Sequence, residues 1–144
     1  MLPGFAGLSY EERLRKLELP SLAYRRSRGE RIEVYKILTG VYDPECTEGL
    51  FERRGGNNVN TRGHSMRIKK PPVARTTARS KSFVYRTVNP WNSLSEHVIS
   101  ANSVMAFERR LDKFWRNQEQ KYDYKALIST TRSQEDNEER VPQA

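Results

Sequence analysis

The stretch NSVMAFERRLDKFWR at residues 102–116 has the most regular pattern in this 144-residue chain. Its apolar side chains recur at steps of three and four, which places them on one face of an α-helix. Asn102 or Ser103 can cap the first turn, because either side chain accepts a hydrogen bond from a backbone N–H that the helix leaves unsatisfied. The pattern predicts an amphipathic helix whose apolar face consists of Val104, Phe107, Leu111 and Phe114 or Trp115.

A shorter helix is predicted near the N-terminus. Ser9 and Glu12 have the spacing of a capping box, in which each side chain bonds the other residue's backbone N–H. Leu19-Pro20 ends this helix, because proline disfavours a helical conformation in the residue before it. We expect the final helix to pack on the first two helices, against Leu14, Leu17, Ile32 and Tyr35.

A second helix is predicted from Ser21, its N-cap, to Thr39, with Gly40 as the terminator. Gly29 predicts a kink or a break within it, since glycine in a helix interior costs about 1 kcal/mol. The second half of this helix carries an apolar stripe at helical spacing, formed by Ile32, Tyr35 and Leu38 with Val34 and Ile37 beside them.

The middle of the chain is less regular. Asp43-Pro44 begins a loop, and Gly55-Gly56-Asn57-Asn58 is typical of a flexible connector. Met66-Arg67-Ile68 alternates as a short strand does, and residues 83–88 are rich in aromatic and β-branched side chains. These two stretches are therefore predicted to pair as a small ribbon.

A helical interpretation of the second stretch stays open, because Val84, Val88 and Trp91 also fit a period of 3.6 residues. Asn89-Pro90 favours the strand, since asparagine can cap, and proline can start, a new short helix carrying Trp91 and Leu94.

Together these elements predict a mainly α fold: a small helical domain with at most a short two-stranded β ribbon, flexible loops and a disordered C-terminal tail. The tail is predicted because the residues beyond Lys125 are polar and acidic, with little apolar content to form a core. The expected organisation is a helical segment at 1–40, a flexible connector at 41–63, a basic segment plus the amphipathic helix at 64–126, and a disordered acidic tail at 127–144.

The positive charge is concentrated in one part of the chain. The net charge is +8, yet the segment from Arg53 to Ser95 contains ten Lys or Arg residues and no Asp or Glu, which leaves the flanks at −2. Such a segment concentrates cationic potential and favours polyanionic partners.

Membrane and secretory classes are not favoured. No apolar run approaches the roughly 18 residues that a membrane span needs, so we expect no membrane association. Residues 1–8 lack the basic and apolar regions of a signal peptide. The single cysteine, Cys46, excludes an internal disulfide and fits a reducing nuclear or cytoplasmic compartment.

The sequence predicts no catalytic site, no metal site and no cofactor. A two-metal polymerase or nuclease needs carboxylates that converge on ions about 4 Å apart. The aspartates are scattered instead, at Asp43, Asp112, Asp123 and Asp136. His64, His97 and Cys46 have no metal-ligand spacing, and nothing beside Cys46 supplies a base that would activate it.

Nucleic acid is the polyanion that this composition favours, because cations interleaved with Phe83 and Tyr85 suit phosphate neutralisation together with base stacking. The alternative for the central segment is a disordered basic linker without a specific ligand. Trp91, Phe107, Phe114 and Trp115 are assigned to the core by their helical spacing. The predicted binding residues are Arg25, Arg26, Arg28, Arg62, His64, Arg67, Lys69, Lys70, Arg75, Arg79, Lys81 and Arg86.

Several motifs occur in the order found after the polymerase palm of non-LTR (LINE-type) retrotransposon reverse transcriptases. They are Tyr10-Glu11-Glu12-Arg13-Leu14, Leu19-Pro20-Ser21-Leu22, Tyr24-Arg25-Arg26 with Arg28-Gly29, Tyr35-Lys36-Ile37, Thr61-Arg62-Gly63-His64-Ser65, Trp91-Asn92-Ser93-Leu94 and Phe107-Glu108-Arg109-Arg110-Leu111-Asp112-Lys113. The chain thus resembles the C-terminal region of that family over about residues 2–126.

The resemblance implies a thumb-like segment at 1–40 and a C-terminal extension that grips RNA or an RNA–DNA hybrid. It also implies that the catalytic aspartates belong to fingers and palm outside this chain, which are candidate partners. Glu18 departs from the family's usual glycine, and Ser95 from its frequent proline. A different interpretation is a protein-interaction or assembly module, in which the basic segment and the amphipathic final helix dock a partner.

Overall fold

A computed structural model describes residues 3–54, 63–72 and 75–128. Within these ranges the protein is mainly helical, as predicted, and has no β-sheet; its strand-like pairing is a single antiparallel bridge between Arg53 and Ile68. None of the described helices is long and apolar enough to cross a membrane. Residues 129–144 of the predicted tail and residues 55–62 of the predicted connector lie outside the described residues. Ile128, which the prediction assigned to the tail, is described and packs against the core.

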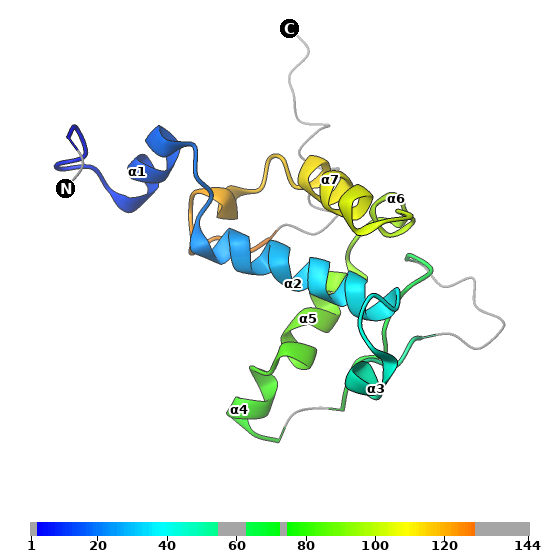
Figure 1. Cartoon of the computed structure of the whole chain (residues 1–144). Coiled ribbons are helices and arrows are strands. Elements are labelled where there is room, and N and C mark those ends of the chain that lie inside the picture. The colour runs from blue at the N-terminus through cyan, green and yellow to red at the C-terminus, as the bar shows by residue number, and fades with distance from the viewer. Residues whose placement is uncertain (1–2, 55–62, 73–74, 129–144) are drawn as a thin grey trace, which may run out of the picture.

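The long helix α2 (Leu22–Leu38) is the centre of the fold. Helix α7 (Val104–Phe114) packs on one side of α2, and α5 (Phe83–Asn92) packs against α2 as well (Figure 1). Around them lie α1 (Tyr10–Leu17), α3 (Pro44–Thr47), α4 (Thr77–Ser80), α6 (Glu96–Ile99) and the 3-10 helix η1 (Glu119–Lys121).

Three of the predicted helix starts are confirmed, those at Ser9, Ser21 and Ser103. The capping box is present, since the Glu12 N–H donates to Ser9 Oγ at 3.2 Å and the Ser9 N–H donates to Glu12 Oε2 at 2.7 Å. Ser21 caps α2 and Ser103 caps α7. The break predicted at Gly29 is absent, because α2 is continuous across it. Packed residues on both sides of Gly29 outweigh the cost of one helical glycine, about 1 kcal/mol.

Stacked aromatic side chains hold the three main helices together. Tyr35 on α2 lies parallel to Phe107 on α7, with ring centroids 4.3 Å apart. The Trp91 ring on α5 lies 5.9 Å from the same phenylalanine. Ile32 and Tyr35 are buried as expected, and Trp91, Phe107 and Trp115 belong to the core with Phe114 packed beside it. The core assignment of these aromatics is therefore confirmed.

The ribbon predicted from Met66–Ile68 and residues 83–88 is wrong. Residues 83–92 form α5, and the helical alternative is correct because one face of this helix buries Val88 and Trp91 against the core. Pro90 lies in the last turn of α5 and does not begin a new helix. The loop predicted to start at Asp43-Pro44 is also wrong, since Asp43 caps the short helix α3.

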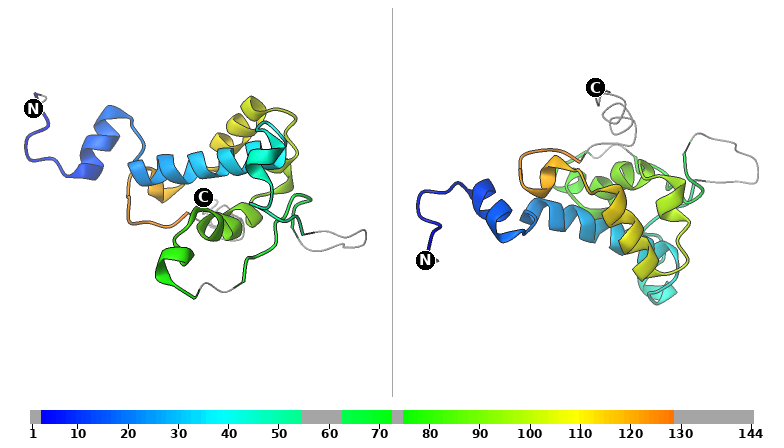
Figure 2. Two further views of the ribbon diagram at one scale, coloured as in Figure 1. Left: turned by 60° about the horizontal axis from the view of Figure 1, so that its bottom comes forward. Right: turned by 90° about the horizontal axis from the view of Figure 1, so that it is seen from above.

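Helix α1 projects from the rest of the fold, as Figure 2 shows. Leu17 is 43% exposed, so its expected place in the core is wrong. The helix instead contacts the segment around η1: the Arg15 guanidinium lies 4.6 Å from the centroid of the Tyr122 ring, and Tyr10 meets Tyr124 edge to face.

The first prediction concerns the aromatic stack. Because Phe107 is fully buried between Tyr35 and Trp91, a Phe107→Ala substitution should lower the free energy of unfolding by about 3–5 kcal/mol. Chemical denaturation followed by circular dichroism measures this loss. Met105→Ala, on the exposed face of the same helix, is the control and should change stability little. A Phe107→Ala variant as stable as the parent would contradict this core.

The second prediction concerns Glu18, which ends α1 in the left-handed conformation with φ at 54°. This conformation costs a residue that has a Cβ atom about 1 kcal/mol, and it costs glycine nothing comparable. Glu18→Gly should therefore stabilise α1 by about 0.5–1 kcal/mol. Slower amide hydrogen exchange in α1 would show the gain. Glu18→Ala removes the carboxylate but keeps Cβ; an equal gain there would assign the effect to charge.

Candidate nucleic-acid interface

The predicted cations of the central segment lie on the loop at 63–72, just before and after the short helix α4, and on α4 and α5 themselves. Arg62 lies outside the described residues. Four of the others, Lys70, Arg75, Arg79 and Lys81, are exposed, and none of the four forms an ion pair with another described residue. The structure thus leaves Arg75, Arg79 and Lys81 as unneutralised cations in and beside α4, with Lys70 on the loop that precedes them.

An aromatic side chain accompanies these cations. The Arg79 guanidinium lies 5.8 Å from the centroid of the Tyr85 ring, which is half-buried. Phe83, the other aromatic residue predicted to contact bases, packs against the core beside Phe51. Tyr85 is therefore the better placed of the two to stack on a ligand.

Two predicted cations are neutralised by acidic residues from outside the segment. Arg86 Nε donates to Glu30 on α2 at 2.6 Å, and Lys69 pairs with Glu52. The segment itself has no carboxylate, so these partners come from elements that are distant in the sequence. Both cations contribute to tertiary structure before they contact any ligand.

The three arginines predicted on α2 divide in the same way. Arg28 makes a two-pronged contact with Asp112 on α7, with N–O distances of 2.6 and 3.0 Å. Arg25 and Arg26 are exposed and form no ion pair within the described residues. Arg28 therefore joins α2 to α7, and the other two are available to a ligand.

His64 is only 4% exposed and has a structural place. Its Nδ1 accepts a hydrogen bond from the Met66 N–H at 3.2 Å, which puts the ring proton on Nε2, and Nε2 donates to the Trp91 carbonyl at 2.9 Å. Burial lowers the pKa of His64, against smaller opposing effects of that carbonyl and of Glu96. His64 is thus uncharged at neutral pH and connects the loop at 63–72 to α5.

Arg67 is half-buried, with its side chain against Gly63.

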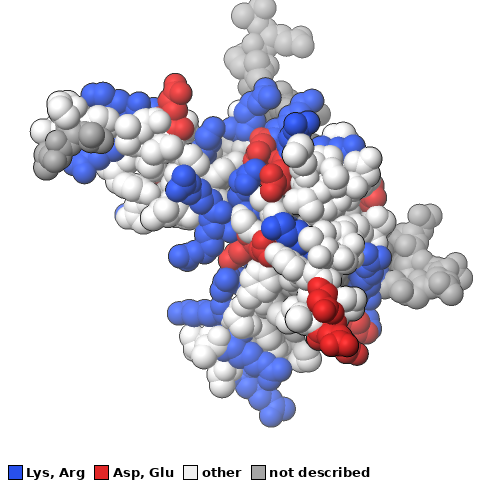
Figure 3. Space-filling view, viewed as in Figure 1, with Lys and Arg blue, Asp and Glu red and all other residues white. Residues whose placement is uncertain are grey.

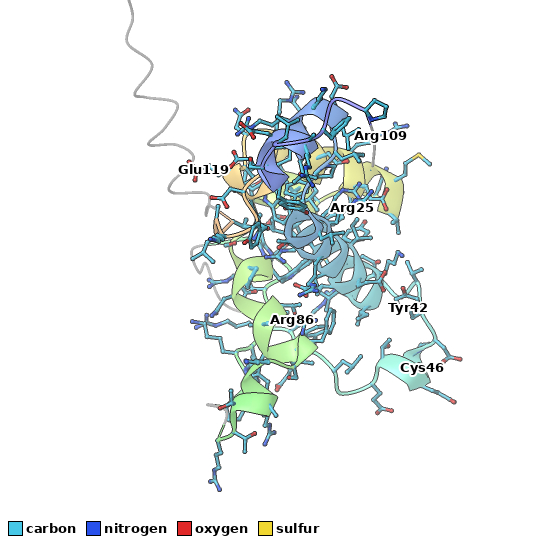
Figure 4. All side chains as sticks on the ribbon, turned by 90° about the vertical axis from the view of Figure 1, so that its left-hand side faces the viewer. Arg25, Tyr42, Cys46, Arg86, Arg109 and Glu119 are labelled. Atoms are coloured by element: carbon cyan, nitrogen blue, oxygen red, sulfur yellow. The ribbon has the colours of Figure 1, made fainter. Side chains whose placement is uncertain are left out.

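Sequence reasoning missed a cationic groove between α2 and the end of α7. The groove has a volume of about 650 Å³, and Figure 4 labels Arg25 and Arg109, which both line it. Arg109, Lys113 and Arg116 lie on the polar side of the final helix that the sequence predicts. Only the fold places that side beside α2 and η1. Six cations line the groove: Arg25, Arg28, Arg109, Lys113, Arg116 and Lys121.

The distribution of charge over the surface follows from these placements. In Figure 3, Lys and Arg side chains follow the left side of the main body, over α2 and down to α4. Asp and Glu side chains form a cluster near α3, and others lie on α1 and between the basic side chains over the middle of the body. The basic side chains on this face thus form a row that is interrupted by a few carboxylates.

The third prediction follows from the burial of His64. The unfolded chain takes up a proton near the ordinary histidine pKa of about 6.5, while the folded protein does so only at lower pH. The stability due to neutral His64 is present above that pH and is lost as the pH falls. Thermal melts from about pH 7.5 to about pH 5.5 should show this loss. The loss of stability on acidification should be smaller in His64→Gln than in the parent. It should be unchanged in His97→Gln, which alters an exposed histidine. Equal pH dependence of stability in the two variants would contradict the prediction.

The chemistry of this surface is electrostatic. Among the described residues, no group of three or more His, Cys, Asp or Glu side chains could hold a metal ion. Asp112, on the wall of the groove, is occupied by Arg28. No protein-family model, curated protein or solved structure matches the chain.

Proposed function

We propose that this chain is a non-catalytic nucleic-acid-binding fragment that grips RNA or an RNA–DNA hybrid through its phosphates. The supporting observation is the group formed by Lys70, Arg75, Arg79 and Lys81, which keeps its positive charge exposed after flanking carboxylates have neutralised neighbouring cations. Unpaired exposed cations gain from a phosphate backbone, because binding releases the counterions condensed on it. Tyr85 beside Arg79 adds a surface for base stacking.

The role fits the C-terminal region of a non-LTR retrotransposon reverse transcriptase, which the motifs resemble. In that role the chain would hold the RNA or the RNA–DNA hybrid, and the fingers and palm of the polymerase would supply the metal-binding aspartates. The chain by itself would then neither extend a primer nor cleave nucleic acid. The reducing nucleus or cytoplasm is the compartment where such a protein meets its RNA.

A protein-docking module is the second candidate. Its proposed contact, the apolar face of α7, is buried against α2 in this structure, since Phe107 and Leu111 are fully enclosed. What favours docking is a different set of residues: Leu17 and Leu19 are each 43% exposed, and Leu22 is 70% exposed. A partner would therefore sit where α1 meets α2.

The fourth prediction tests the phosphate contacts. Replacing Lys70, Arg75, Arg79 and Lys81 together by Gln should weaken binding to a short RNA–DNA hybrid and flatten the log–log dependence of affinity on salt. Four lost contacts at about 0.9 each correspond to a change in slope of roughly 3 to 4. Fluorescence anisotropy titrations at several salt concentrations measure both quantities.

The control exchanges Lys for Arg and Arg for Lys at the same four positions, which keeps the charge and should keep the slope. If the parent binds and the Gln variant retains its slope, these residues do not contact phosphates. If the parent binds no nucleic acid at low salt, the proposed function is wrong and the docking module takes its place.

A further inference from the structure

The groove between α2 and α7 combines three separate elements into one cationic surface. Arg25 and Arg28 come from the first half of α2, Arg109 and Lys113 from α7, and Lys121 from η1. Arg116 follows Trp115, the C-cap of α7, and completes the set. Asp112 is the one carboxylate on the lining, so the side chains of the groove carry a net charge of +5.

That carboxylate does not compete for a ligand. Both oxygens of Asp112 accept hydrogen bonds from Arg28, at 2.6 and 3.0 Å. Glu108 lies 3.9 Å from the same guanidinium. The acidic residues of α7 are thus directed at Arg28, which fixes α7 beside α2 and leaves the remaining five cations to face the groove. Of these five, Arg25, Arg109, Lys113 and Arg116 are exposed.

The groove has a rigid floor. Tyr24 is buried and meets the buried Trp115 edge to face, with ring centroids 5.9 Å apart. Ser21 Oγ donates to the Gln120 carbonyl at 2.5 Å, which attaches η1 to the start of α2. This packing fixes α2, α7 and η1 around the groove before a ligand binds, so that binding orders only the exposed side chains and not the helices.

Spacing and residue type indicate phosphates in sequence. Arg109 and Lys113 are one turn apart, about 6 Å along the helix axis, and Arg116 extends the row beyond the end of α7. A row of cations spaced in this way can contact more than one phosphate of the same strand. Four of the six cations are arginines, whose planar forks bind phosphate oxygens in pairs.

We infer that this groove is a preformed site for consecutive phosphodiesters of one nucleic-acid strand, separate from the cations around α4. The inference rests on the proposed function, because it assigns part of the same ligand to a second surface. It names Arg109, Lys113, Arg116 and Lys121 as binding residues, with Arg25 opposite them. Arg28 is a positioning residue that holds the two walls of the groove together through Asp112.

The test uses the full chain with Arg109, Lys113 and Arg116 changed together to Gln, and a short fluorescein-labelled RNA–DNA hybrid as the probe. Losing two to three duplex contacts should flatten the salt slope by about 2 to 3 and weaken binding roughly 50- to 500-fold at about 0.1 M salt. A matched variant, Arg13→Gln with Arg54→Gln and Lys125→Gln, removes the same charge from exposed residues outside the groove and should change the slope by less than about 1. Melting curves confirm that both variants fold.

The outcomes separate the two hypotheses. A parent that binds no hybrid overturns the proposed function and the groove with it. A parent that binds, with groove and matched variants equally affected, overturns the groove alone. Polyglutamate that binds the parent more tightly than the hybrid does at the same salt concentration, and loses this advantage in the groove variant, would assign the site to an acidic protein segment and overturn the phosphate assignment. A loss confined to the groove variant, with Arg109→Lys, Lys113→Arg and Arg116→Lys together retaining the slope, supports it.

Discussion

The rest of the fold depends on the enclosure of Trp91. Its ring lies against Phe107, which stacks on Tyr35, so one side chain connects α5 with α7 and α2. Its indole N–H donates to the Met66 carbonyl at 2.9 Å, and its own carbonyl accepts from His64. The neighbouring Asn92 side chain bonds both the N–H and the carbonyl of Ile68. A loop without regular structure is thereby fixed to the helical core.

The parts of the fold that were predictable from the sequence are those determined by local chemistry. Ser9, Ser21 and Ser103 cap helices because a hydroxyl oxygen is in reach of unsatisfied N–H groups a few residues away. The apolar face of α7 was predictable because its apolar residues recur at steps of three and four within one short segment of the sequence. By contrast, β-branched residues in α5 favour a strand locally, and only the burial of Val88 and Trp91 against the other helices decides for a helix.

The candidate site was less predictable, because the availability of a cation depends on pairing between distant residues. Arg86 and Glu30 are 56 positions apart, and Arg28 and Asp112 are 84 apart. The local excess of charge showed where cations are numerous but not which of them acidic residues of the flanks neutralise. The groove was missed for the same reason, since Arg109 and Arg25 become neighbours of one groove only when α7 crosses α2.

Ion pairing therefore divides the basic residues into two sets: one connects the helices, and the other stays exposed and unpaired. Glu30 lies between Arg31 and Arg86 and is the nearest carboxylate to both; Arg31 is buried under Trp115, and burial lowers its pKa to about 10, so it stays charged at neutral pH. Each carboxylate that is paired in this way connects parts of the fold. Because it is already bound to an arginine, it no longer competes with a ligand for the other cations. The acidic residues of the flanks thus hold the helices in place, and the cations that they leave unpaired form the surface open to a polyanion.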